Sequence, residues 1–171
     1  TQGVRPVVAV YSTFLQRAYD NIVHDVALQD LPVVFAMDRA GIAGEDGPTH
    51  HGAFDLAYML SVPGMKVTAG KDGAETLALL RLATRSDAPG PWSLRWPRAA
   101  VPGEVPELDA IPGVEPFTWE ILRNGGDAAV LAVGTMVMPA LEAARALAEE
   151  GIRVTVVNCR FLKPYDAEAF Q

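Results

Sequence analysis

Apolar runs alternate with amphipathic segments along most of the chain. The runs expected to form strands lie at residues 7–11, 33–37, 65–69, 92–96, 117–123, 128–133 and 152–157. Several of these runs are apolar at consecutive positions, which is typical of strands buried on both faces. Residues 12–27 and 139–150 instead repeat apolar side chains every three to four positions, which predicts helices. Strands that alternate with helices predict an α/β fold with mostly parallel sheets flanked by helices.

Polar residues and glycines mark the expected ends of these elements. Ser12 or Thr13 is expected to cap the first helix, in which Phe14 would be an early core position. Asp72 with Glu75 has the spacing of a capping box, and Gly151 has the place of a helix-ending glycine. A turn at residues 124–127 is expected to join two strands.

Residues 99–116 are rich in proline and glycine and predict a linker. This linker would divide the chain into a unit at residues 1–98 and a second unit at residues 117–171. A chain of 171 residues is compatible with one or two domains. Because Thr1 is not a methionine and lies almost directly before a strand-like run, we expect the chain to be a fragment of a longer protein.

The charge balance excludes several classes of function. With 14 basic against 21 acidic residues, the net charge of −7 argues against a nucleic-acid binder and against a polybasic membrane anchor. No apolar run is long enough to span a bilayer. The single cysteine, Cys159, excludes an intrachain disulfide and favours a reducing, cytosolic setting. Its place in a buried strand favours packing over reactivity.

The first group of candidate functional residues follows the first predicted strand. Ligands of open α/β sheets bind at the carboxyl ends of strands, where Tyr11, Phe14 and Arg17 are found. Phe14 could stack on a flat ring, and Arg17 could donate hydrogen bonds to it. The alternative is that Phe14 belongs to the core and that Arg17 is solvated.

The second group lies in the long glycine-rich segment 38–52, which carries an arginine, acidic residues and two histidines. A connection of this length in an α/β unit is usually functional, and histidine is suited to proton transfer near neutral pH. A mobile polar loop and a metal site are the alternatives. His24, in the middle of a helix, is expected to be structural. Arg95 and Arg98 lie at the carboxyl end of another predicted strand and could bind phosphate or carboxylate.

Several of these segments resemble one family. Residues 8–20, 38–42 and 46–50, together with Trp96-Pro97-Arg98, resemble the 1-deoxy-D-xylulose-5-phosphate synthase family of the transketolase superfamily. The resemblance implies that residues 1–98 are the latter part of a pyrimidine-binding domain, and that residues 117–171 begin a transketolase C-terminal domain. It also implies that an N-terminal diphosphate-binding domain, its magnesium motif and a cofactor-binding glutamate lie outside this sequence.

The resemblance further implies a reaction and site residues. The family condenses pyruvate with glyceraldehyde 3-phosphate and releases carbon dioxide, in the first step of non-mevalonate isoprenoid precursor synthesis, using thiamine diphosphate and Mg²⁺. It implies that the parent enzyme is a cytoplasmic homodimer and that this chain holds no metal ligand. By resemblance, Phe14 and Arg17 bind the cofactor. The residues facing the reacting carbons would be Tyr11, Asp46 and His50, with His50 transferring protons. Arg39 and Arg98 would clamp the acceptor's phosphate.

The chain departs from the family at two of these places. Ala99 stands where the family usually has glycine, and His51 stands where many members have glutamine. Two alternatives stay open: the β subunit of a 2-oxo acid dehydrogenase E1 component, which residues 63–67 would fit, and a non-catalytic transketolase-like paralogue. We expect the 171-residue chain alone to be inactive, because half of the cofactor cleft would be missing.

Overall fold

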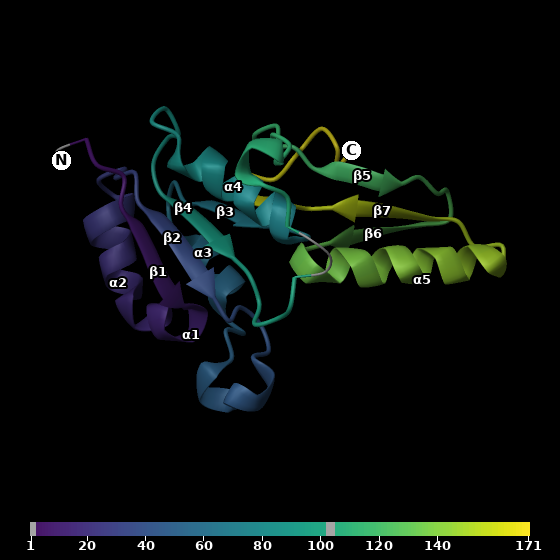
Figure 1. Cartoon of the computed structure of the whole chain (residues 1–171), viewed down its shortest axis with the longest axis horizontal. Helices are drawn as coiled ribbons and strands as arrows, with labels where there is room; N and C mark the ends of the chain where they lie inside the picture. Colours follow the sequence, from purple (N-terminus) through teal and green to yellow (C-terminus); the bar gives the residue numbers. More distant parts are fainter. Residues whose placement is uncertain (1–2, 102–104) are drawn as a thin grey trace.

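The computed structural model describes residues 3–101 and 105–171 and contains two sheets (Figure 1). The larger sheet has five strands in the order β1-β2-β4-β3-β8. These strands are β1 (Val7–Tyr11), β2 (Val34–Asp38), β3 (Lys66–Ala69), β4 (Trp92–Arg95) and β8 (Phe161–Lys163). The first four are mutually parallel, and β8 is antiparallel to β3. The predicted α/β fold with mostly parallel sheets is therefore confirmed.

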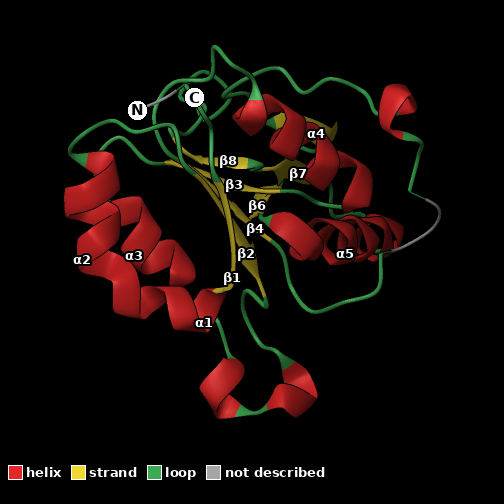
Figure 2. Ribbon diagram, turned by 60° about the vertical axis from the view of Figure 1, so that its left-hand side comes forward, coloured by secondary structure: helices red, strands yellow, loops and turns green. Residues whose placement is uncertain are grey.

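Helices cover both faces of the larger sheet (Figure 2). One face is covered by α1 (Ser12–Leu15), α2 (Tyr19–Asn21), the π-helix Ile22–Ala27 that continues from α2, and α3 (Asp55–Ser61), and the other face by α4 (Gly73–Thr84). On β2, Phe35 and Met37 pack into the core toward α1 and α3, whereas Val34 packs with Leu79 of α4. Burial of neighbouring positions on opposite faces explains why this strand is apolar at consecutive positions.

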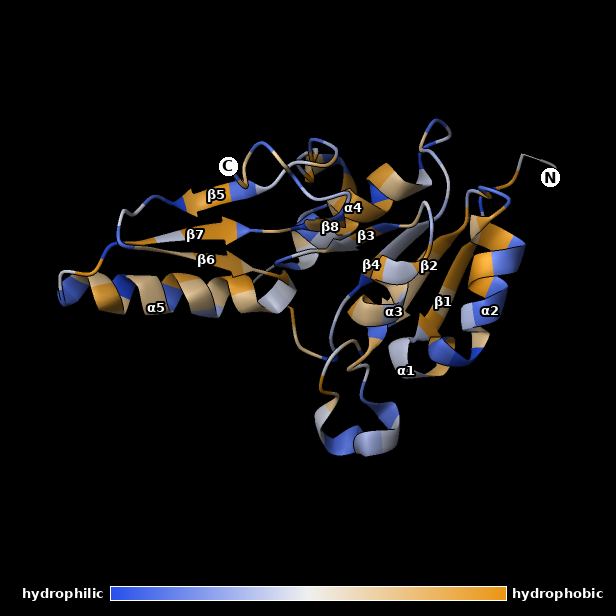
Figure 3. Ribbon diagram, turned by 180° about the vertical axis from the view of Figure 1, so that it is seen from behind, coloured by the Kyte–Doolittle hydropathy of each residue, from blue (hydrophilic) through white to orange (hydrophobic). Residues whose placement is uncertain are grey.

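The smaller sheet contains β5 (Glu120–Arg123), β7 (Val154–Asn158) and β6 (Ala128–Ala132), in that spatial order. β6 is parallel to β7 and β5 is antiparallel to it, while α5 (Val137–Glu149) packs against the sheet. The predicted turn at residues 124–127 therefore connects two strands that are not neighbours, because β7 lies between them. Ala144 and Leu141 of α5 pack into this core. In Figure 3, α5 carries both hydrophobic and hydrophilic colours along its length.

Two of the three expected helix-end signals are confirmed. Asp72 accepts a hydrogen bond of 2.7 Å from the backbone N–H of Glu75, although the Glu75 carboxylate accepts from the backbone N–H of Lys71 and not from that of Asp72 as in a capping box. Gly151 follows α5 with a φ of +84°. The expected cap at Ser12 or Thr13 is wrong: Tyr11 occupies the N-cap position, and no side chain caps the helix. Ser12 is instead fully buried.

The C-terminal part of the chain contributes to the larger sheet. After β7 the chain passes Arg160 and enters β8, whose Phe161 packs against Trp92 and Phe117. The predicted linker, residues 99–116, includes residues 102–104, which lie outside the described residues. Among the others in it, Leu108–Ala110 form a 3₁₀ turn. None of the helices in the described residues has the length and hydrophobicity needed to cross a membrane.

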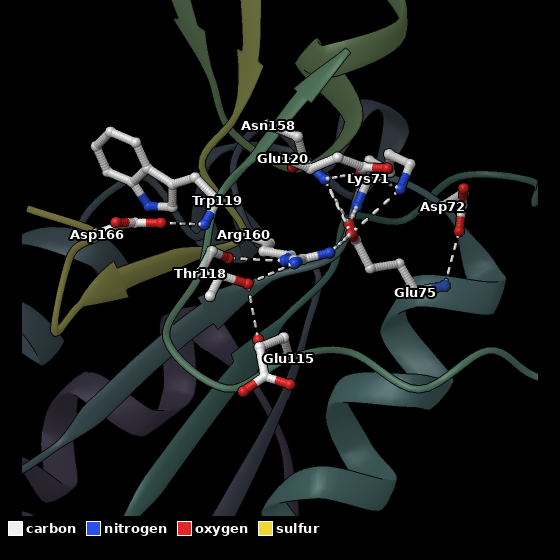
Figure 4. A network of polar contacts seen from close by, with 10 residues as sticks. All are labelled: Lys71, Asp72, Glu75, Glu115, Thr118, Trp119, Glu120, Asn158, Arg160 and Asp166. Atoms are coloured by element: carbon white, nitrogen blue, oxygen red, sulfur yellow. Dashed lines mark hydrogen bonds and ion pairs between the residues drawn. The ribbon is translucent and has the colours of Figure 1, made fainter. Parts of the chain in front are cut away.

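A network of polar contacts joins the two sheets (Figure 4). The buried carboxylate of Glu75 accepts hydrogen bonds from Asn158 at 2.9 and 3.1 Å and from Lys71 at 3.2 Å, and Arg160 lies 3.5 Å away. Lys71 also bonds to Glu120 at 2.8 Å. Burial alone would raise the pKa of Glu120, but the hydrogen bonds from Lys71 and Asn158 and the nearby positive charges outweigh it, so that pKa is lowered.

Candidate active site

The candidate residues follow strands whose carboxyl ends meet at one edge of the larger sheet. Tyr11 ends β1, Asp38 ends β2 and Arg95 ends β4, and the parallel register pairs Tyr11 with Asp38 and Met37 with Arg95. The segments that leave these strands therefore start side by side. This edge is where open α/β sheets bind ligands.

Three aromatic rings from two segments gather at this edge. The ring centres of Tyr11 and Phe14 are 5.7 Å apart in a stacked arrangement, and His50 meets the Phe14 ring edge-on at 5.3 Å. His50 also lies 6.3 Å from Tyr11. Phe14 remains 40% exposed, so the alternative that it is a core position is wrong.

The charged candidates lie beside these rings. The guanidinium carbon of Arg39 is 4.4 Å from the centre of the Tyr11 ring, in cation–π geometry. Arg39 forms an ion pair with Asp46, and Nη1 of Arg98 lies 3.6 Å from the other carboxylate oxygen of Asp46. The structure thus brings the two arginines that were predicted to bind phosphate to opposite sides of one carboxylate.

The loop that carries Arg39, Asp46 and His50 projects from the sheet edge (Figure 1). Its base is closed by two hydrogen bonds between the backbones of Gly41 and Gly52, at 3.0 and 2.8 Å. Within the loop, Ala43 N–H donates to the ring of His51 at 3.0 Å. These bonds give the loop a defined path, in contrast to a solvated connection without internal contacts.

Three other residues considered from the sequence, Arg17, His24 and Cys159, make no contact with this cluster of rings and charges that the structure records. Arg17 lies on the exposed side of the helix beyond Phe14, and it forms no ion pair with any described residue. His24 is exposed and pairs with Asp20 at 2.9 Å on the same helix. Cys159 is buried, and burial raises the pKa of its thiol to about 11. Within residues 3–101 and 105–171, no three histidine, cysteine, aspartate or glutamate side chains are grouped to hold a metal ion.

Sequence reasoning missed a buried polar cluster below the site. Asp55, only 1% exposed, accepts hydrogen bonds from Ser12 at 3.1 Å and from Arg95 at 2.9 Å. The hydroxyl of Tyr58 donates to the backbone carbonyl of Ser12 at 3.0 Å. Burial, followed by the charge of Asp55, raises the pKa of Tyr58 to about 12. An aspartate in the first turn of a helix is usually a solvated residue that favours the helix dipole, so the sequence offered no sign of this role.

The residues at this edge fit the aromatic part of a thiamine-type cofactor. Phe14 stacks on Tyr11 and still has open surface, which suits stacking on a flat heteroaromatic ring. His50 beside that ring offers a hydrogen-bonding group. The fit concerns the ring only, since no part of the described chain offers a grouped set of ligands for the metal that would accompany a diphosphate.

Comparison with protein families decides the relationship. Residues 1–104 match the family described as "Transketolase, pyrimidine binding domain", and residues 118–171 match "Transketolase, C-terminal domain". The chain belongs to the transketolase family. The expected transketolase type is therefore confirmed, and the expectation that the sequence contains a pyrimidine-binding and a C-terminal segment agrees with these two matches.

Curated relatives within the transketolase family are identical to this chain at about half of the aligned positions. The chain is 55% identical over 167 residues to "1-deoxy-D-xylulose-5-phosphate synthase 1" of Geobacter sulfurreducens and 56% identical over 165 residues to the synthase of Aquifex aeolicus. These alignments cover 98% and 96% of the chain but only 26% of each relative. The resemblance to the synthase family is thus confirmed, and the chain spans about a quarter of the length of these relatives.

Solved structures of transketolases share the fold. A structure named "Split gene transketolase, inactive beta4 tetramer" superposes with a TM-score of 0.82 at 34% identity, covering 96% of this chain and 51% of that one. A transketolase from Pichia stipitis in complex with sedoheptulose 7-phosphate superposes with a TM-score of 0.81 at 24% identity, covering 97% of this chain and 24% of that one. The larger and smaller sheets therefore have the arrangement found in transketolases.

Proposed function

We propose that this chain is part of a 1-deoxy-D-xylulose-5-phosphate synthase, a thiamine-diphosphate-dependent transferase that condenses pyruvate with glyceraldehyde 3-phosphate and releases carbon dioxide. The observation that carries the proposal is the convergence of Phe14, His50, Arg39 and Arg98 at one edge of the sheet. These residues come from segments far apart in the sequence. A ring-binding surface beside two guanidinium groups suits a flat cofactor next to a phosphorylated substrate.

The proposed role of Phe14 is to stack on the aminopyrimidine ring of the cofactor, and that of Arg17 is to donate hydrogen bonds near it. Bound thiamine diphosphate supplies a carbon nucleophile that also accepts the electrons left by decarboxylation. The open surface of Phe14 supports its role. Arg17 has only its place one turn beyond Phe14 in support, so its role rests on the resemblance to the family.

Arg39 and Arg98 are proposed to bind the phosphate of the acceptor. Forked guanidinium groups bind phosphate through paired hydrogen bonds. Asp46 holds both arginines in the structure and is the group that an incoming phosphate would replace as their partner. This arrangement keeps two cations near each other without a substrate, because one carboxylate neutralises part of their repulsion.

His50 is proposed to transfer protons to and from the reacting substrate. Its ring centre lies 5.3 Å from that of Phe14 and 6.3 Å from that of Tyr11, and the hydroxyl of Thr49 shares a hydrogen bond of 2.9 Å with its Nδ1. That contact leaves the other ring nitrogen for a substrate oxygen. The proposed places of Tyr11 and Asp46 are beside the same reacting carbons.

The remaining parts of the proposal concern the whole protein. We propose that residues 1–98 and 117–171 act as parts of two domains joined by residues 99–116, and that the diphosphate and Mg²⁺ are bound by other parts of the protein. The whole enzyme is proposed to be a cytoplasmic homodimer. The 171-residue chain alone is proposed to be inactive.

The test is an assay of the full-length protein that contains this chain. With thiamine diphosphate and Mg²⁺, pyruvate and glyceraldehyde 3-phosphate should give 1-deoxy-D-xylulose 5-phosphate and carbon dioxide. Transfer to a lipoyl acceptor instead would identify a dehydrogenase E1 component, and no turnover with either acceptor would indicate a non-catalytic paralogue. Turnover by the 171-residue chain alone would contradict its proposed inactivity.

A further inference from the structure

We propose that Asp55 is a positioning residue that holds together the three segments carrying the candidate site. The expected effect of Asp55 on enzyme kinetics rests on the proposed function, whereas its expected effect on the structure does not. Its structural part is that the buried carboxylate fixes the start of α1, the end of β4 and the base of the loop at residues 39–52 relative to one another.

The carboxylate of Asp55 is almost fully used by partners from different elements. Oδ2 accepts from Ser12 Oγ at 3.1 Å and from Arg95 Nε at 2.9 Å, while Oδ1 accepts from the backbone N–H of Leu56 at 2.7 Å. The Arg95 side chain is only 16% exposed and the Asp55 side chain 1%. Separating this buried carboxylate from its guanidinium partner would leave each charge uncompensated in a poorly solvated place, so the contact restrains both elements.

The bond to Ser12 fixes the segment that carries the aromatic rings. Ser12 lies directly between Tyr11 and Thr13, two residues before Phe14. The Tyr58 hydroxyl holds the backbone carbonyl of Ser12, and Thr13 Oγ1 donates to the Thr49 carbonyl at 3.3 Å. The place of Phe14 beside His50 therefore depends on this turn.

The bond to Arg95 fixes the segment that carries Arg98. Arg95 is the last residue of β4, and Trp96, which follows it, accepts a backbone hydrogen bond from Ala40 at 3.0 Å. Nη2 of Arg95 also lies 3.7 Å from the place where a Cβ on Gly41 would be. Arg95, at the end of β4, thus places its guanidinium group close to the start of the loop.

The loop returns to the cluster at Gly52, three residues before Asp55. A Cβ at Gly52 would lie 2.3 Å from Ser12 Oγ and 2.7 Å from the backbone oxygen of Arg39, distances that no side chain can adopt. Because glycine has no Cβ, the backbone at Gly52 can pack directly against Ser12 and against the backbone of Arg39 at the other end of the loop. The buried pair of Asp55 and Ser12 therefore lies directly against the end of the loop at Gly52.

The experiment compares Asp55→Asn with Glu75→Gln in the full-length protein. Both substitutions remove one buried carboxylate with cationic partners, but Glu75 lies on α4, which covers the opposite face of the larger sheet from α3 (Figure 2). Amide hydrogen exchange of residues 39–52 should become on the order of tenfold faster in Asp55→Asn and stay within about twofold in Glu75→Gln. Asp55→Asn should also raise the KM for glyceraldehyde 3-phosphate more than the KM for pyruvate.

The outcomes separate this inference from the proposed function. Unchanged exchange in residues 39–52, or equal acceleration by Glu75→Gln, would overturn the positioning role whatever the activity. Faster exchange confined to Asp55→Asn would support it even if the unaltered protein lacks synthase activity, which would contradict only the proposed function. If Asp55→Asn does not fold, Ser12→Ala removes one partner without leaving a charge unpaired. It should accelerate the same amides by a smaller factor, and its failure to do so would overturn the inference.

Discussion

The guanidinium carbon of Arg39 lies 4.4 Å from the centre of the Tyr11 ring, so a cation that follows β2 covers an aromatic ring at the end of β1. Arg39 has a positive φ of +57°, an uncommon conformation for a residue with a side chain. Asp38 stabilises this turn by accepting the Arg39 N–H at its Oδ1. The ring and the turn together direct the guanidinium toward Asp46.

This relationship predicts different effects for two substitutions at Tyr11. Tyr11→Phe retains a ring under Arg39, so the KM of the full-length enzyme for glyceraldehyde 3-phosphate should stay within about twofold. Tyr11→Ala removes a cation–π contact of about 1 kcal/mol and should raise that KM roughly fivefold. Steady-state kinetics with both substrates measures the difference. Equal KM values for the two variants would show that the ring does not position Arg39.

The N-terminus of α4 offers a test of local stability. Asp72 caps this helix through the Glu75 N–H, and removing the cap in Asp72→Ala should lower the free energy of unfolding by about 1 kcal/mol. Asp72→Asn retains a capping oxygen and is the matched control. Because asparagine and aspartate are similarly good N-caps, the free energy of unfolding should fall by only about a few tenths of a kcal/mol. Urea unfolding measures both. A similar loss in the two variants would contradict the capping role.

The contacts of Glu120 predict a pH dependence. Its pKa is lowered in the folded protein from an ordinary value of 4.5, because the bonds from Lys71 and Asn158 outweigh burial. The stabilisation is therefore fully present above pH 4.5 and is lost as the pH falls through the folded pKa. Urea unfolding between pH 7 and pH 3 should show Glu120→Gln less stable than the unaltered protein at pH 7, with the gap closing in acid.

A substitution on the surface serves as the control for Glu120. Glu149 lies on the exposed side of α5. The gap in the free energy of unfolding should be larger for Glu120→Gln than for Glu149→Gln at pH 7. A gap for Glu120→Gln that stays constant down to pH 3 would contradict the role assigned to its charge.

Burial predicts low reactivity for Cys159. Its pKa of about 11, against an ordinary value of 9.0, leaves roughly a hundredfold less thiolate at pH 8 than an unfolded chain has. Alkylation by iodoacetamide should therefore be at least about a hundredfold slower in the folded protein than in urea, since access is also restricted. Mass spectrometry over time measures both rates. Comparable rates would mean that the thiol is exposed in solution.

The parts of the fold that the sequence predicted depend on short-range patterns. The consecutive apolar residues of β2, the cap at Asp72 and the glycine after α5 each act over a few residues, and each is found in the structure. The neighbours of a strand depend on contacts far along the chain. Nothing near residues 124–127 indicated that β7 would lie between β5 and β6.

The candidate site shows the same division. The ends of predicted strands and the long glycine-rich segment singled out Phe14, Arg39 and His50, the resemblance to a family assigned their roles, and the structure brings the three together. The sequence pattern placed Phe14 in the core and Ser12 at a helix cap, because helical spacing does not reveal which face a ligand edge leaves open. Asp55 escaped notice because its partners are 40 and 43 residues away in the sequence.

The antiparallel strand β8 has a consequence for engineering the protein. It covers the outer edge of β3 with a segment that comes after the smaller sheet. Cutting the chain between residues 99 and 116 would remove that cover and leave the backbone amides and carbonyls of β3 free to recruit strands from other molecules, a known cause of aggregation. The pyrimidine-binding segment should therefore be produced together with residues up to Lys163 rather than alone.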